Sequence, residues 1–158
     1  EPQGLTWRAG TADKEYVMGL SRGEGGTGWN SMSKRDFAMV CGGDGYLFIY
    51  EQGSFVQGSG PDGSFGEYRP SDQLEIRVVA DTVSYHLNGR LLHTSAQKPA
   101  FPLRADCLFY SPGTRVEGVR LLVVEQAPVS APAPASVASG SSSGVQTWGA
   151  TVGSGKGY

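Results

Sequence analysis

The chain has little cysteine, no long apolar run and no concentration of positive charge. Its two cysteines among 158 residues are too few for a disulfide scaffold. No apolar run approaches the roughly 20 residues that a membrane span needs. The basic residues are scattered, with Lys34-Arg35 the only adjacent pair, and the net charge is −2. These absences argue against a membrane-spanning segment and against nucleic acid as the main partner.

Helical periodicity and catalytic motifs are missing as well. No segment keeps a 3.6-residue apolar repeat over three turns. The pattern E-x-D-x-x-E, which would place paired carboxylates for glycoside hydrolysis on one strand, does not occur. Among the single carboxylates, Glu51 is the least weak candidate for catalysis, although an acidic residue at a strand end is expected to be solvated. The sequence therefore predicts a protein that is not an enzyme and needs no cofactor.

Alternation between apolar and polar residues is the strongest positive signal. Residues 74–79 and 82–87 alternate with period 2, and Asn88-Gly89 then predicts a two-residue type I′ turn into a return strand. Turns are also expected at 43–45, 61–63 and 111–113. The full set of candidate strands is 4–9, 15–20, 36–41, 46–51, 54–57, 64–68, 74–80, 82–87, 90–94, 105–110 and 116–124.

This number of short strands predicts an all-β fold, a jelly-roll-like antiparallel sandwich over residues 1–125. Alternation also predicts which side chains face the core. The expected core residues are Leu20, Phe37, Met39, Leu47, Ile49, Ile76, Val78, Val83, Tyr85, Leu87, Phe109, Val119 and Leu121.

The composition changes after the last candidate strand. Residues 126–144 are rich in Pro, Ala, Ser and Gly, which predicts an extended linker. Residues 145–158 regain apolar side chains, and Val145, Trp148 and Val152 are candidates for a docking peptide that contacts a partner chain or an open sheet edge. A frayed terminus and the start of a further domain are the alternatives.

Three motifs resemble a known superfamily. They are D-F-A-M at 36–39, D-G-x-L-x-I-Y-E-x-G at 44–53 and T-V-x-Y-x-x-N-G at 82–89. Residues 4–124 resemble the concanavalin A-like lectin/glucanase modules. The resemblance implies a sandwich of two antiparallel sheets, in a class that includes lectins, glycosidases and adhesion modules. Such modules usually begin with one more strand, so an open sheet edge is expected here.

Candidate ligand residues follow from local chemistry. Trp29-Asn30 pairs an aromatic side chain with an amide, as sugar-binding loops do, and Asp44 lies in a glycine-rich turn. A loop Trp folded back on the sandwich is the more conservative interpretation of Trp29, and turn chemistry alone can explain Asp44. His86 and His93 are expected to face each other across the 88–89 hairpin, but without a third ligand they predict no metal site.

The two cysteines allow two arrangements. Both Cys41 and Cys107 are expected to point into the core as free thiols, and a disulfide is possible only if their strands are neighbours. A start at Glu1-Pro2 is compatible with a removed leader, a fragment or an artificial boundary. That start and the extracellular type of fold favour a non-cytosolic location.

Two kinds of function remain. The first is a non-enzymatic structural or accessory subunit of a larger assembly, such as a photosynthetic, ciliary or extracellular complex. Such a subunit would bind other protein subunits, and could associate peripherally with a membrane complex. The second is a carbohydrate-binding, lectin-like module, and glycoside hydrolysis is a distant third.

Overall fold

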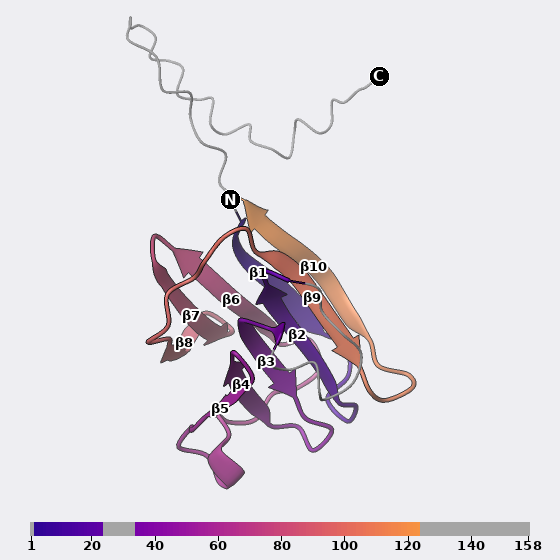
Figure 1. Cartoon of the computed structure of the whole chain (residues 1–158). Coiled ribbons are helices and arrows are strands. Elements are labelled where there is room, and N and C mark those ends of the chain that lie inside the picture. Colours follow the sequence, from indigo (N-terminus) through magenta and orange to yellow (C-terminus); the bar gives the residue numbers. More distant parts are fainter. Residues whose placement is uncertain (1, 24–33, 124–158) are drawn as a thin grey trace, which may run out of the picture. The chain divides into compact units, whose positions relative to one another are not determined.

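Alternating side chains build ten strands in the computed structural model, which describes residues 2–23 and 34–123 (Figure 1). No helix in these two ranges is long and apolar enough to cross a membrane. The elements are β1 (Pro2–Ala9), β2 (Tyr16–Ser21), β3 (Phe37–Cys41), β4 (Leu47–Glu51), β5 (Ser54–Val56), η2 (Pro61–Gly63), β6 (Gln73–Val79), β7 (Thr82–Leu87), β8 (Arg90–Thr94), β9 (Arg104–Phe109) and β10 (Val116–Val123).

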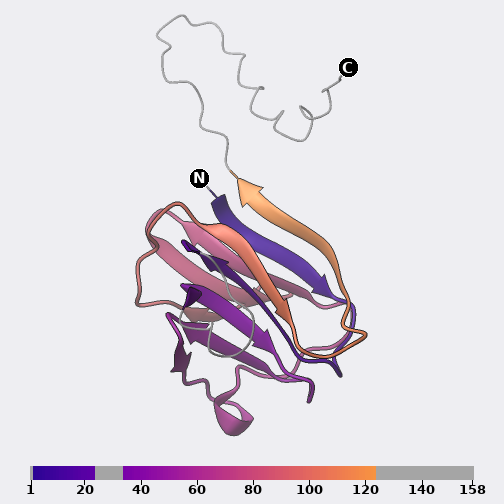
Figure 2. The same cartoon turned by 45° about the vertical axis from the view of Figure 1, so that its right-hand side comes forward.

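The strands form two five-stranded antiparallel sheets. The first sheet has the order β10-β1-β6-β7-β8 and the second the order β5-β4-β3-β2-β9. β1 faces β2 and β6 faces β3. The next strands outward, β10 and β9, therefore lie on the same flank, and Figure 2 shows them there. The predicted all-β, jelly-roll-like sandwich is confirmed for the described residues. The predicted linker, 126–144, and docking peptide, 145–158, lie outside them.

One apolar core fills the space between the sheets. Ten of the thirteen expected core residues are buried, from Leu20 on β2 to Leu87 on β7. Trp7, Tyr16 and Leu74, which the alternation argument did not single out, are also fully buried. The register Leu5↔Ile76 and Ile76↔Tyr85 puts three core side chains in one row across the first sheet.

Three expected core residues are not buried, and all three lie on the two adjoining edge strands. Phe109 on β9 and Val119 and Leu121 on β10 are 47%, 47% and 38% exposed. Phe109 is paired with Tyr16 and Leu121 with Leu5, so both have the parity of core-facing residues. For Phe109 and Leu121 the alternation was therefore right and the predicted burial was wrong, because no described strand covers this flank. Val119 lies at a shift in the register between β1 and β10.

Of the remaining local predictions, the turn at Asn88-Gly89 is confirmed and the strand at 64–68 is wrong. Asn88 and Gly89 have φ of 51° and 82°, and Leu87 pairs with Arg90, as a type I′ turn requires. Residues 64–68 form only an isolated bridge between Tyr46 and Glu67, not a strand.

The two histidines do not face each other. A bulge in the pairing of β7 with β8 sets His86 against Leu91 and Tyr85 against His93, which puts the imidazoles on opposite faces.

The contrast between core and edge gives a stability prediction. Ile76→Ala should lower the free energy of unfolding by about 2–5 kcal/mol, because a fully buried side chain leaves a cavity. Val119→Ala, on the exposed flank, should cost less than about 1 kcal/mol. Urea denaturation of both variants measures the difference, and equal losses would contradict the described burial.

The turn gives a second prediction. Gly89→Val places a β-branched residue at φ of 82° and should destabilise the protein by about 1–3 kcal/mol. Open space surrounds the position, so the loss would come from backbone strain and not from a clash. A neutral substitution, measured by thermal unfolding, would show that the hairpin tolerates another turn type.

His86 gives a third prediction, on pH. Burial, helped by the nearby Arg77, lowers the pKa of His86 below its ordinary value of about 6.5. The unfolded chain therefore binds this proton more readily than the folded one, and stability should fall as the pH drops below about 6.5, until it passes the lowered pKa of the folded state. His86→Gln should flatten this part of the pH–stability curve, and an unchanged slope would contradict the assignment.

Candidate functional site

The outer faces of the two sheets differ in chemistry. The first sheet presents polar side chains, among them Thr6, Arg8, Glu75, Arg77 and Ser84. The second sheet has a separate apolar cluster on its outer face, in which Val17, Ala38 and Val40 are buried and Phe48, Tyr50, Leu108 and Tyr110 partly so. A solvated sheet face is normally polar, so this outer face of the second sheet is the candidate binding surface.

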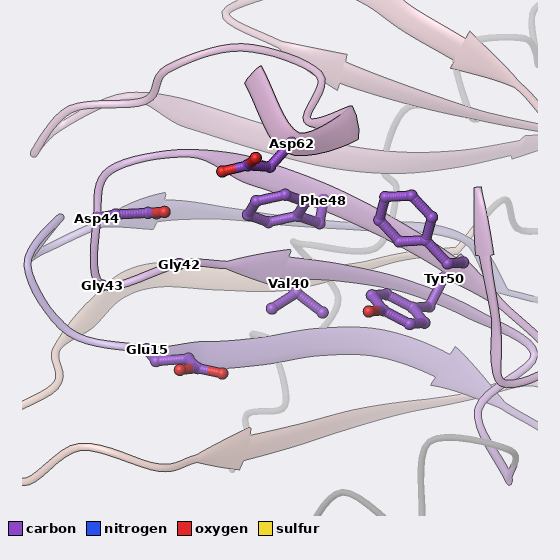
Figure 3. A pocket seen from close by; sticks show the side chains of 9 residues that line it. Glu15, Val40, Gly42, Gly43, Asp44, Phe48, Tyr50 and Asp62 are labelled. Carbon is purple, nitrogen blue, oxygen red and sulfur yellow. The ribbon is translucent and has the colours of Figure 1, made fainter. Parts of the chain in front are cut away.

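A groove of about 530 Å³ lies on this face and is the candidate site (Figure 3). Strands β3, β4 and β5 supply its apolar part, and the loops at one end of the sheet supply its polar part. Its lining is Glu15, Val40, Gly42, Gly43, Asp44, Phe48, Tyr50, Phe55 and Asp62.

Three aromatic rings form one wall of the groove. Phe48 and Tyr50 are successive outward residues of β4. Phe55 lies on the neighbouring strand β5, where it is paired with Tyr50. The ring centroid of Phe55 lies 5.4 Å from that of Tyr50 and 6.3 Å from that of Phe48. Phe55 is 41% exposed, so much of its ring is available to a ligand.

The turn η2 supports the Phe55 ring. Gly63 has φ of 79°, and a Cβ at this position would lie 2.8 Å from Phe55 Cζ. A residue other than glycine would therefore strain the backbone and push against the ring. The turn predicted at 61–63 is present, and in it Asp62 is left-handed as well, with φ of 54°.

Three carboxylates form the polar end of the groove, here called the acidic end: Glu15, Asp44 and Asp62 (Figure 3). Glu15 precedes β2, and its backbone N–H donates to Ser111 Oγ at 3.1 Å. Asp44 lies in the turn between β3 and β4, where its Oδ1 accepts the Tyr46 N–H at 3.0 Å. Asp62 lies in η2, between β5 and β6, so the three carboxylates come from three different loops.

The predicted ligand residues have different outcomes. Asp44 lies in the groove as well as satisfying its turn. Trp29 and Asn30 lie outside the described residues, between Gly23 and Lys34, which flank the other end of β2 and β3. The predicted partner-binding residues Val145, Trp148 and Val152 also lie outside the described part of the chain.

Glu51 was expected to be solvated, but it is buried, and it does not point into the groove. It pairs with Phe37, faces the core and is 8% exposed. Its Oε1 accepts the Tyr85 hydroxyl at 3.1 Å and lies 3.9 Å from His93 Nε2. The negative charge close to the Tyr85 hydroxyl adds to burial in raising the pKa of Tyr85 well above its ordinary value. Glu51 is therefore a hydrogen-bonded core carboxylate.

The cysteines are both free, but only one has the expected burial. Cys41 is buried in the core, and burial raises its pKa to about 12. Cys107 has core-facing parity opposite Met18 but is exposed, because β9 is an edge strand without cover. Within residues 2–23 and 34–123, no group of three His, Cys, Asp or Glu side chains could hold a metal ion.

The aromatic wall is the part of the site that the sequence analysis missed. Its signal was present in the alternation of β4: Leu47 and Ile49 face the core, so Phe48 and Tyr50 had to face outward. Two aromatic rings at successive outward positions are unusual for a solvated strand.

Comparison with protein-family models and with curated proteins finds no match for the chain.

Proposed function

We propose that the protein is a non-enzymatic carbohydrate-binding module whose ligand lies in the groove on the second sheet. The single observation that carries this proposal is the aromatic wall beside the acidic end. A sugar ring has a face of C–H groups and an edge of hydroxyl groups. The C–H face packs on an aromatic ring, and the hydroxyls donate hydrogen bonds to carboxylate oxygens.

The charge of the groove restricts the ligand. The three charged side chains that line the groove are all acidic, so the groove would repel anionic sugars such as uronates or sulfated glycans. The ring of Phe55 offers an exposed surface at the side of the groove, and Tyr50 packs edge-on against it. The ligand class that fits best is a neutral oligosaccharide, bound by stacking and hydrogen bonding without a cofactor.

Glycoside hydrolysis is less well supported. Glycosidases place two carboxylates across the scissile bond from rigid positions. The groove carboxylates Glu15, Asp44 and Asp62 come from separate loops at one end of the groove, while the strand carboxylate Glu51 faces the core. The three groove carboxylates can accept hydrogen bonds from a ligand. They are not held on facing strands as the acid and base of a glycosidase would be.

The accessory-subunit interpretation is the second candidate. The observation that favours it is the exposed apolar flank of β9 and β10, which another chain could cover. Both functions can coexist, because the groove and this flank use different surfaces.

The binding proposal predicts the effect of removing the exposed ring. Phe55→Ala should weaken binding of a neutral oligosaccharide about tenfold or more, because a stacking surface is lost. Glycan-array screening identifies the ligand, and isothermal titration calorimetry then measures the affinity of the wild type and the variant.

Controls separate the groove from the rest of the surface. Leu91→Ala removes a side chain that is 53% exposed on the first sheet and should leave binding unchanged. Asp62→Asn should weaken binding, whereas Asp81→Asn, an exposed carboxylate outside the groove, should not. Absence of any glycan ligand would refute the proposal, and release of new reducing ends from a bound glycan would show an enzyme instead.

A further inference from the structure

An asparagine–glycine pair occupies the tip of the β7–β8 hairpin. Asn88 and Gly89 are exposed, with φ of 51° and 82°. They are the two central residues of the turn, since Leu87 pairs with Arg90. Gly89 has no side chain to shield its backbone nitrogen, and open space lies where a Cβ would stand. Such a nitrogen can attack the side-chain amide of the preceding asparagine, so the turn is a candidate site of chemical modification.

Both ends of the Asn88 side chain are held by the chain where β6 begins. Its Oδ1 accepts the Gln73 N–H at 2.8 Å, and its Nδ2 donates to Asp72 Oδ1 at 2.9 Å. A backbone N–H can only donate, so the first contact identifies the amide oxygen and places the amide nitrogen against Asp72. The Asn88 N–H also donates to the Gln73 carbonyl, at 2.7 Å. The hairpin tip is thereby bound to the turn before β6.

Asp72 is itself held in place as the acceptor. Its Oδ2 accepts the Arg69 N–H at 2.8 Å, and its own N–H donates to the Arg69 carbonyl at 3.1 Å. Its carbonyl accepts the N–H of Ala9 on β1 at 3.0 Å. The carboxylate cannot turn away from Asn88 without losing the Arg69 N–H. The bond to Asn88 is charge-assisted, and such bonds are stronger than those between neutral groups.

We propose that Asn88 is a slow deamidation site whose rate is set by Asp72. The Gly89 nitrogen attacks Cγ of Asn88, and the new N–Cγ bond forms as the Cγ–Nδ2 bond breaks. Ammonia leaves with the proton of the Gly89 N–H. Water then opens the five-membered imide at either carbonyl and gives aspartate or isoaspartate. The attack requires Cγ to turn until the reacting atoms are about 3–3.5 Å apart, and the hydrogen bonds to Asp72 and Gln73 oppose this rotation.

The product loses the contact that delayed its formation. Aspartate in place of Asn88 has no amide hydrogens, so two carboxylate oxygens would meet where Nδ2 now donates to Asp72 Oδ1. Isoaspartate instead lengthens the backbone of the two-residue turn by one carbon, so Leu87 and Arg90 could not pair as they do now. Either product releases the hairpin tip from the turn before β6. The groove lies on the other sheet, so the inference is independent of the proposed binding function.

The deamidation rate is measured on the full-length protein in mildly alkaline buffer. Peptide mass analysis follows conversion at Asn88 with time, and the urea-unfolded chain gives the unprotected rate. Folding should slow deamidation about a hundredfold, and Asp72→Ala should speed it up about tenfold in the folded protein, because one charge-assisted hydrogen bond is lost. Asp72→Asn, which keeps the shape of the side chain, should act in the same direction.

The matched control is Asp81→Ala. Asp81 is an exposed carboxylate in the turn between β6 and β7, where it lies 3.5 Å from Lys98 Nζ. This substitution should leave the rate at Asn88 unchanged. Circular dichroism checks that the sheets are intact in each variant.

An exchange of the two side chains tests the contact itself. Asn88→Asp, which is also the deamidated form, places two acceptors together, and Asp72→Asn leaves one oxygen for the Arg69 N–H and Asn88 Nδ2. Each substitution alone should lower the midpoint of thermal unfolding by about 3–6 °C. The two together restore one donor and one acceptor in the reverse direction, so the double variant should recover most of the loss.

Three results would overturn the inference. Deamidation as fast in the folded protein as in the unfolded chain would show that the contacts give no protection. A rate that neither Asp72→Ala nor Asp72→Asn increases would show that Asp72 does not control it. A double variant that is no more stable than Asn88→Asp would show that this pair does not hold the hairpin.

Discussion

A buried hydrogen bond between the sheets fixes how they face each other. Trp7 on β1 donates its indole N–H to the hydroxyl of Tyr16 on β2 at 3.2 Å, and both residues are fully buried. Burial raises the pKa of Tyr16 far above its ordinary value, so the hydroxyl keeps its proton. Loss of either partner would leave a polar group unpaired in an apolar core. This contact holds β1 over β2, and β6 faces β3 beside it.

The parity of each strand is the constraint that connects the fold to both surfaces. Once Tyr16 and Leu47 point inward, Val17 and Phe48 must point outward, and a slip of one residue would exchange the two sets. The same alternation turns Phe109 and Leu121 toward a core that ends before it covers them. The groove and the exposed flank of β9 and β10 are therefore two consequences of one register, on a face and on a side of the sandwich.

The sequence predicted the elements better than their surroundings. Period 2 and Asn88-Gly89 located β6, β7 and β8, because the information for a hairpin is local. Burial of Phe109 and Cys107 could not be predicted, since it depends on whether β9 is a central or an edge strand, which is a property of the whole sheet. The bulge that separates His86 from His93 adds one residue to the register and gives no clear signal in composition.

The candidate site shows the same limit. Asp44 was found from its turn, but the aromatic wall required the knowledge that the outer face of β4 meets Phe55 from β5 and the turn η2. Glu51 was misplaced for the opposite reason: the end of a strand was taken as solvated, whereas Tyr85 and His93 approach it from the other sheet. Contacts between sheets are the part of the structure that a single strand pattern does not contain.

The positions of the two cysteines determine how the protein would respond to a change of redox environment. β2 lies between β3, which carries Cys41, and β9, which carries Cys107. The two cysteines are also paired with different residues of β2, Tyr16 and Met18, so their Cα atoms are more than about 10 Å apart. This separation is too large for a disulfide within the chain. An oxidant would reach Cys107 and leave Cys41 untouched. Oxidation would therefore join Cys107, at an edge of the second sheet, to glutathione or to another exposed thiol by a disulfide bond, while the thiol of Cys41 inside the sandwich stays reduced.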